Sequence, residues 1–393
     1  MSTPDGTGDE AGQQAVPLRT IAREWARLGC TGFGGPPAHI ALLRRMCVDE
    51  RGWMTAAEFE DGIAATSLLP GPASTQLAIF CAWRLRGPAG AIIGGACFIV
   101  PGLVLILLLS AVFLARHPAG WVLGAAAGAG AAVPAVALSA ASGFVPASWK
   151  RIGPSAGQRA RWVAFAIAGG AAAATIGPYL VLVLLACGLT EVAIRWEARR
   201  GGAVGAVAVA AGHAATAGGL AALAWVALKV GALSYGGGFV IVPLMQHDAV
   251  TAYHWMTGAQ FLNAVALGQV TPGPVVLTVA AVGYAARGVP GGLLATLVAF
   301  TPSFLLVLVG GPRFDQIRAS VVIQSFLTGA GPAVIGAIAG SAIPLGLAFQ
   351  HLWQIPVLAG ALLWLFAARL GVVSGLLIAA GTGLLIALSG IPV

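Results

Sequence analysis

The sequence predicts an all-α polytopic membrane protein built from two inverted-topology repeats with broken or re-entrant helical hairpins. Hydrophobic residues make up 58% of the 393 residues and charged residues only 9%, which is too few to cover a water-soluble surface. Apolar stretches long enough for spanning helices recur from about residue 89 to the C-terminus, and the alternating pattern of a β-barrel is missing. A duplicated sequence unit predicts the two halves.

The first element is a polar, Gly-rich and acidic stretch over residues 1–16, which lacks the basic start of a secretory signal. We expect a disordered tail. The net charge of +8 comes from 21 Lys and Arg residues in short clusters between apolar stretches. Positive-inside topology explains them, so the lipid bilayer and not nucleic acid is the predicted partner. Five scattered cysteines lack metal-ligand spacing, and neither a metal site nor a cofactor is predicted.

The repeat joins residues 29–72 to residues 231–274 at a constant offset of 202, with 14 of 44 positions identical. Both copies contain a WMT run, at 53–55 and 255–257, and a later PGP run. Each copy belongs to a unit of roughly 200 residues, about the size of one domain. We therefore expect a first transporter repeat over 17–200, a linking transmembrane helix over 201–228 and a second, inverted repeat over 229–393.

Each unit is expected to contain a Gly-broken segment, a helical hairpin broken at PGP, and four spans. The spans are expected near 90–115, 119–143, 162–177 and 178–195, and near 290–311, 320–343, 354–369 and 371–391. The single linking span would invert the second unit. The number of full spans stays open, because the PGP hairpins could be re-entrant or could cross completely.

The basic residues support the inversion. The stretches 44–52 and 145–161 are rich in Arg and Lys, whereas their counterparts 246–254 and 344–356 contain neither. A cytoplasmic N-terminus places 18 basic residues on the cytoplasmic side and leaves Arg116, Lys229 and Arg287 elsewhere. The C-terminus is then expected in the periplasm. Inverted repeats with broken helices are the recurring plan of secondary transporters.

The breaks predict an oxyanion site. GFGGPPAHI (32–40) and LLPGPASTQ (68–76) place Gly and Pro inside apolar helical sequence, and 234–242 and 269–277 repeat the arrangement. Each break starts a half-helix whose free N–H groups attract anions, and up to four such ends could converge. The alternative is that Gly and Pro only kink or pack helices. The predicted substrate-binding residues are Gly34, Gly35, Pro36, His39, Pro70, Gly71, Pro72, Ser74, Thr75, Gln76, Gly236, Gly237, Gln269, Pro272, Gly273 and Pro274.

Ionisable residues near the breaks are candidates for proton coupling and anion entry. Glu60, Asp61 and His213 are the proton-coupling candidates, because carboxylates and histidines inside membranes are often functional. A structural role is the alternative for each. The predicted anion entrance consists of Arg44, Arg45, Arg84 and Arg86. Positive-inside topology alone would also place these arginines on the cytoplasmic side.

The motifs GFGGPPAHI, WMT, PGP and GQVTPGP resemble the chromate ion transporter (CHR) family, in its long two-domain form, over nearly the whole chain from about residue 18. The resemblance implies an inner-membrane secondary transporter that exports chromate and confers resistance, with sulfate as a competitor or second substrate. The second copy has Gly238-Phe239 for Pro36-Pro37 and Ile241 for His39, so the first half looks more committed to the chemistry. The alternatives are another oxyanion transporter or channel, and a membrane enzyme acting on lipid phosphate. We expect no enzymatic activity and leave a homodimer open.

Overall fold

The computed structural model describes residues 16–67, 69, 71–115, 118–152, 154–175, 179–200, 219–234, 241–310 and 320–393. This part of the chain is helical and contains no β-strand, which confirms the all-α class. Of the predicted residues, Pro70, His213, Gly236 and Gly237 lie outside the described residues, as does the tail before residue 16.

Four described helices are long and apolar enough to cross a membrane: α4 (Ala73–Phe113), α5 (Gly120–Lys150), α11 (Thr278–Gly310, with η4 before it) and α13 (Val321–Leu347). The other elements are α1 (Leu18–Thr31), α2 (Pro36–Arg44), η1 (Arg45–Glu50), α3 (Ala56–Thr66), α6 (Ala156–Thr175), α7 (Leu180–Arg200), α8 (Leu220–Leu233), α9 (Ile241–Gln246), η3 (His247–Ala252), α10 (Gly258–Val270), η4 (Val275–Leu277), α14 (Gln354–Leu362), η6 (Leu363–Ala367) and α15 (Val372–Leu388). The protein is thus a multi-pass membrane protein.

The sequence repeat is also a structural repeat. Helices α1 and α8 begin 202 residues apart, as do the π-helical turns η1 and η3. Both hairpin helices start with the expected capping box, Thr55 with Glu58 and Thr257 with Gln260. Helix α8 is therefore the counterpart of α1, although it spans position 228, where the linking helix was expected to end. The proposed domain bounds stay a prediction, since residues 201–218 are outside the description.

The long helices α4 and α11 each contain a sharp reversal of the chain. Arg86 and Gly87 have φ/ψ of −150°/24° and 60°/−151°, and Arg287 and Gly288 repeat these values within a few degrees. A Cβ at Gly90 would lie 2.2 Å from the carbonyl oxygen of Ala82, a contact that a continuous helix cannot make. Each PGP segment is therefore followed by a short helix that folds back onto a spanning helix.

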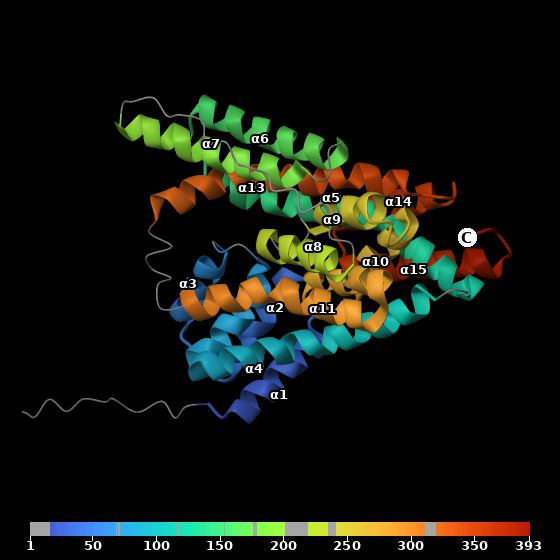
Figure 1. Cartoon of the computed structure of the whole chain (residues 1–393), viewed down its shortest axis with the longest axis horizontal. Coiled ribbons are helices and arrows are strands. Elements are labelled where there is room, and N and C mark those ends of the chain that lie inside the picture. The colour runs from blue at the N-terminus through green and yellow to red at the C-terminus, as the bar shows by residue number, and fades with distance from the viewer. Residues whose placement is uncertain are drawn as a thin grey trace, which may run out of the picture.

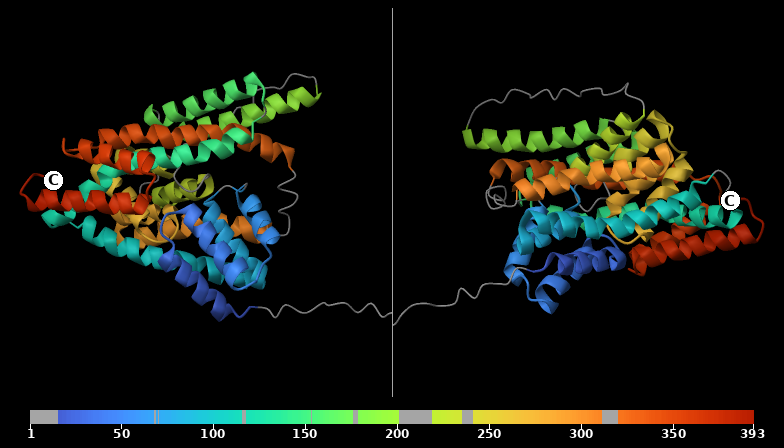
Figure 2. Two further views of the ribbon diagram at one scale, coloured as in Figure 1. Left: turned by 180° about the vertical axis from the view of Figure 1, so that it is seen from behind. Right: turned by 60° about the horizontal axis from the view of Figure 1, so that its bottom comes forward.

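The two halves exchange helices (Figures 1 and 2). Helix α5 of the first half packs on α15 of the second, and α13 of the second half packs on α6 and α7 of the first. Glycines permit the close crossings, because a Cβ at Gly128 would lie 2.2 Å from the carbonyl oxygen of Ala379 and one at Gly336 would lie 1.8 Å from that of Ala166. In both figures α3 lies near one end of the molecule and the C-terminus near the other.

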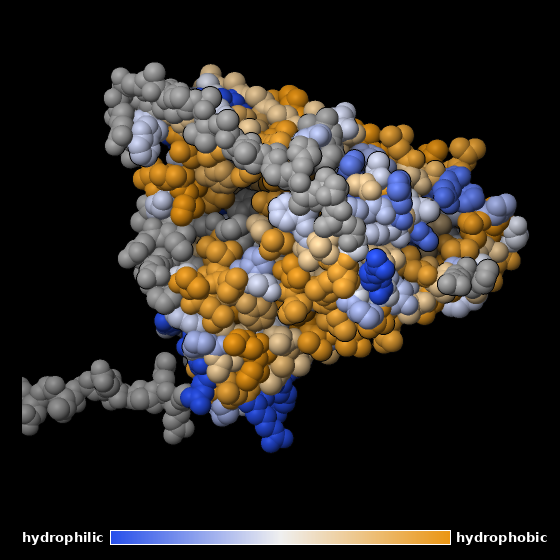
Figure 3. All heavy atoms as spheres, viewed as in Figure 1, coloured by the Kyte–Doolittle hydropathy of each residue, from blue (hydrophilic) through white to orange (hydrophobic). Residues whose placement is uncertain are grey.

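The outer surface suits a bilayer. Apolar residues cover most of the face shown in Figure 3. Large apolar side chains on several helices are strongly exposed, including Leu297 at 70%, Ile167 at 65% and Leu385 at 68%. A water-soluble monomer rarely exposes apolar area on this scale, so these side chains are expected to face lipid.

Candidate functional site

The first PGP segment is the tip of a helical hairpin, here called the first hairpin, formed by α3 and the start of α4 up to residue 85. A Cβ at Gly62 would lie 2.6 Å from the Phe80 ring, so the two arms run antiparallel. Arg84 and Glu58 join the open end through a 2.6 Å ion pair. At the tip Gly71 has φ +127°, a conformation that side chains other than glycine rarely adopt.

The second hairpin, formed by α10, η4 and the start of α11 up to residue 286, repeats this fold. A Cβ at Gly268 would lie 2.0 Å from the Thr278 hydroxyl oxygen, which shows that these arms are also antiparallel. Gly273 at the tip has φ +97°. The sequence therefore located both breaks correctly, and each break is the tip of a helical hairpin. Re-entrant insertion of the hairpins stays a prediction.

Each tip contacts the long helix of the opposite half. A Cβ at Gly102 of α4 would lie 2.3 Å from the carbonyl oxygen of Pro272 in the second tip. The Ser303 hydroxyl of α11 lies 3.1 Å from the position that a Gly71 Cβ would take in the first tip. Gly102 and Ser303 follow the equivalent prolines Pro101 and Pro302, so the two contacts are related by the repeat.

A chain of hydrogen bonds connects the two tips. The N–H of Gly273 donates to the carbonyl oxygen of Gly32 over 2.9 Å. The same oxygen lies 2.9 Å from Nε2 of His39, whose Nδ1 lies 3.2 Å from the Ser74 hydroxyl. Since a carbonyl only accepts, Nε2 of His39 donates to it. Both ring nitrogens are used within the protein, so His39 positions the first hairpin against Gly32.

Four buried polar groups on the two hairpins, on α11 and at the end of α8 have no hydrogen-bond partner in the described structure. They are Oγ1 of Thr75, Oγ of Ser234, Nε2 of Gln269 and Oγ of Ser303. Their side chains are at most 7% exposed. A buried donor without a partner costs about 1–3 kcal/mol, so a cluster of them points to a polar ligand. Of these four residues, Thr75 and Gln269 are among the predicted substrate-binding residues, and Ser303 is not. The signal for Ser303 was its match to Gly102 directly after a repeated proline.

Helix starts lie beside the tips. Helix α2 begins with Pro36 and Pro37, which have no N–H to donate, and α4 begins at Ala73 after Pro72. A Cβ at Gly35 would lie 3.6 Å from the Val275 side chain, so the start of α2 lies beside η4, which follows Pro274. Four helix starts were expected to converge. The break that precedes α9, at residues 235–240, lies outside the described residues.

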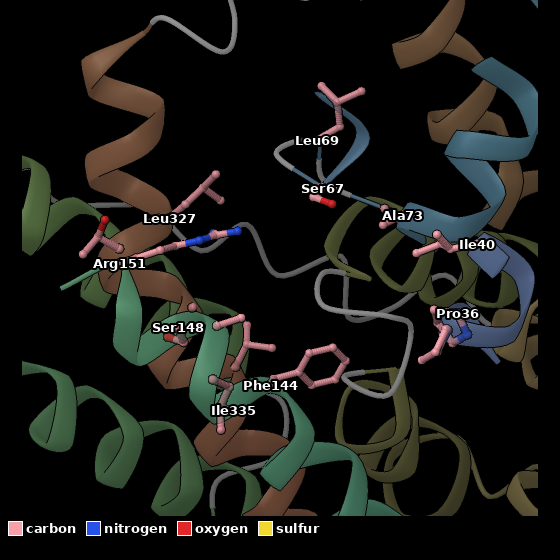
Figure 4. Close-up of a pocket in the computed structure, with 16 residues that line it drawn as sticks. Pro36, Ile40, Ser67, Leu69, Ala73, Phe144, Ser148, Arg151, Leu327 and Ile335 are labelled. Atoms are coloured by element: carbon pink, nitrogen blue, oxygen red, sulfur yellow. The ribbon is translucent and has the colours of Figure 1, made fainter. Parts of the chain in front are cut away.

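A cavity of about 390 Å³ lies beside the first hairpin (Figure 4). One wall consists of the first break and tip, with Pro36, Ser67 and Gly71. The opposite wall consists of α5 and α13, including Ser148 and Thr328. Arg151, after the end of α5, points into the space between these walls.

The four arginines of the predicted entrance, all within the described residues, do not line this cavity. Arg45 pairs with Glu50 over 2.7 Å, and Arg84 is held by Glu58. Arg44 and Arg86 are exposed. The entrance role of this set stays a prediction, and Arg151 is the arginine among the described residues that line the cavity.

The predicted proton-coupling carboxylates lie on α3. Glu60 and Asp61 are both exposed, one helical turn before the buried Ala65 and Thr66. Their second-half counterparts, Leu262 and Asn263, are buried and half-buried. The two hairpins thus have different environments despite their common fold.

Paired helical hairpins whose tips contact the opposite half of a helical membrane protein are typical of membrane transporters. The chain matches the chromate transporter family over residues 19–192 and 221–386, and it belongs to that family. Both halves are matched, as expected for the long two-domain form.

Curated relatives agree with this assignment. The chain is 32% identical to a chromate transport protein of Cupriavidus metallidurans over 84% of this chain and 82% of the relative. It is 31% identical to a chromate transport protein of Pseudomonas aeruginosa, covering 86% and 84% of the two chains. A probable chromate transport protein of Synechococcus elongatus is 29% identical over 86% of each chain. No solved structure matches the chain significantly.

Proposed function

We propose that this protein exports chromate from the cytoplasm across the inner membrane and holds the dianion between the two hairpin tips. Chromate transport across the membrane follows from its family. The single observation that supports the site is the set of buried, unpaired groups at or beside the tips: Thr75, Gln269 and Ser303.

The chemistry of these groups suits a small tetrahedral oxyanion. Chromate presents four oxygens that only accept hydrogen bonds at neutral pH. Hydroxyl, amide and helix N-terminal N–H groups can replace its water shell without a cationic side chain. Such groups respond to shape and charge rather than to the central atom, so sulfate should compete for the same site.

The direction of transport rests on charge. Lys150 and Arg151 end α5 and Arg159 and Arg161 follow, which favours a cytoplasmic position for this end. Moving two negative charges out of a negative interior releases about 4–5 kcal/mol per 100 mV. The membrane potential alone is therefore sufficient to drive export, and the C-terminus lies in the periplasm in this orientation.

Labelled chromate uptake into proteoliposomes with an inside-positive potential tests the function. We expect concentrative uptake that unlabelled sulfate inhibits. Uptake that only equilibrates chromate across the membrane would indicate a channel. If neither anion moved with correctly inserted protein, the substrate assignment would be wrong.

The site has its own matched pair of variants. Ser303→Ala removes an unpaired buried hydroxyl at the first tip, and we expect KM for chromate to rise about tenfold, as for loss of one hydrogen bond to a charged group. Ser110→Ala removes another unpaired, fully buried hydroxyl of the long helix α4, eight residues beyond the tip contact at Gly102. We expect that control to leave KM unchanged. Equal KM values for the two variants would contradict the site.

A further inference from the structure

We propose that the cavity beside the first hairpin is an anion vestibule, open toward the cytoplasm, in which Arg151 captures the substrate before it reaches the tips. This inference rests on the proposed export function and orientation. It assigns a second, weaker anion site that is separate from the one between the tips.

The position of Arg151 supports capture. Phe144, Ala147, Ser148 and Arg151 line the cavity from one face of α5 and the residue after it. They run from the interior to the basic end of this helix. Figure 4 shows the Arg151 side chain extending from that end toward the segment that holds Ser67. An anion entering beside the basic end of α5 would meet this guanidinium first.

The inner wall of the cavity continues to the predicted binding site. Pro36 starts α2, Ala73 starts α4 and Gly71 is the first tip, and all three line the cavity. Behind the tip lie the unpaired hydroxyls of Thr75 and Ser303, which are fully buried. The cavity therefore extends from Arg151 to the first tip, in front of these buried hydroxyls.

The walls favour temporary rather than tight binding. Besides Arg151, the polar side chains of the lining are the hydroxyls of Ser67, Ser148 and Thr328. Ser148 accepts a hydrogen bond from Nε1 of Trp162 over 2.9 Å, which leaves its own hydroxyl hydrogen for another acceptor. The remaining described lining residues are apolar, so they add no side-chain hydrogen bond to an anion.

The size of the cavity fits a partly hydrated anion. At roughly 30 Å³ per water molecule, a volume of about 390 Å³ holds on the order of ten waters. A tetrahedral dianion can enter with much of its first water shell and exchange it at the tips. Capture by one arginine should then affect the concentration dependence of transport and not the maximal rate.

Transport kinetics test the role of Arg151 with a matched control. In inverted vesicles, Arg151→Gln should raise KM for chromate about tenfold and leave the maximal rate within about twofold, and added salt should reduce the difference. Arg151→Lys should restore most of the KM. Lys150→Gln makes the same charge change at the neighbouring exposed residue, which does not line the cavity. Equal KM values for Arg151→Gln and Lys150→Gln would overturn the proposal.

Thiol labelling tests the vestibule without transport. Thr328→Cys, in a variant whose five native cysteines are replaced and which still inserts, should react with a membrane-impermeant maleimide from the cytoplasmic side. Ser389→Cys near the C-terminus is the control for the opposite side. Sulfate should protect Thr328→Cys severalfold, and Arg151→Gln should remove the protection. Sulfate is used because chromate oxidises thiols.

The outcomes separate the vestibule from the function. Labelling of Thr328→Cys from the periplasmic side only, or labelling that sulfate does not slow, would contradict the vestibule even if chromate is exported. Protection by sulfate in a protein that transports neither anion would preserve the vestibule and contradict the export function.

Discussion

The two hairpins have the same fold and different surroundings. The second hairpin packs on α5, where a Cβ at Gly130 would lie 2.9 Å from Oδ1 of Asn263. Prolines 134 and 146 of α5 match prolines 332 and 344 of α13 at an offset of 198, so the counterpart of Gly130 is Thr328. The counterpart of Asn263 is Asp61. Thr328 lines the cavity that separates α13 from the first hairpin.

The second hairpin therefore packs directly on α5, which we call the closed side. A cavity separates the first hairpin from the equivalent helix α13, which we call the open side. In an inverted repeat, exchanging the conformations of the two halves produces the state that faces the other side of the membrane. In the proposed orientation this structure faces the cytoplasm. In the opposite state α3 would pack on α13 with Asp61 near Thr328, and α10 would separate from α5 near Gly130 and Asn263.

Paired cysteines that test the closed and open sides should have the largest effect on transport. Gly130→Cys with Asn263→Cys should cross-link on mild oxidation in the resting protein and stop transport, because it fixes the closed side. Asp61→Cys with Thr328→Cys should cross-link only when an outward chromate or sulfate gradient drives turnover. Mobility shifts on gels and chromate uptake measure both. Equal cross-linking of the two pairs at rest would contradict the assignment of one open and one closed side.

Exchanging Gly102 and Ser303, the equivalent residues that contact the two tips, should have the next largest effect on transport. Gly102→Ser places a Cβ 2.3 Å from the carbonyl oxygen of Pro272, and neither backbone can easily move. We expect loss of most transport and a lower thermal midpoint, as for overpacking of about 1–3 kcal/mol. Ser303→Gly at the equivalent position removes the Cβ and its hydroxyl without creating a clash, and it should lower the midpoint much less. Uptake and thermal unfolding in detergent distinguish the two.

The ion pairs of the two halves allow a third comparison. Lys229 and Asp248 join α8 to η3 with side chains 17% and 9% exposed, whereas Arg51 and Glu24 join α1 to the end of η1 with Arg51 40% exposed. Asp248→Asn leaves a lysine in a largely buried site and should destabilise the protein by about 3 kcal/mol. Glu24→Gln leaves exposed arginines and should cost about 1 kcal/mol. Denaturation in detergent measures both, and the reverse order would contradict this ranking.

Much of this architecture could be predicted from the sequence because it depends on local signals. The capping boxes, the proline starts of α2 and the PGP breaks act within a few residues, and duplication makes each visible twice. Arg86 and Arg287 show a further local signal, since each arginine precedes a glycine with positive φ at the chain reversal.

The residues that were missed depend on long-range packing. Ser303 gains its role because the first tip lies against it from the opposite half of the chain. Arg151 belongs to a cluster of basic residues over 145–161, and charge alone does not show which one points into a cavity. The closed and open sides could not be predicted, because both hairpins have the same local sequence signals.

The carboxylates of α3 are expected to have the smallest effect on the difference between the two hairpins. Closing the first hairpin on α13 would bury Glu60 and Asp61 where the second hairpin has Leu262 and Asn263, so the charges oppose closure. Asp61→Asn copies the second-half residue and should favour closure. We expect maleimide labelling of Thr328→Cys to slow about threefold in this variant, which corresponds to less than 1 kcal/mol. Glu58→Gln removes a carboxylate at the open end of the same hairpin, where it pairs with Arg84, and should leave labelling unchanged. Faster labelling in Asp61→Asn would show that the carboxylate favours closure instead.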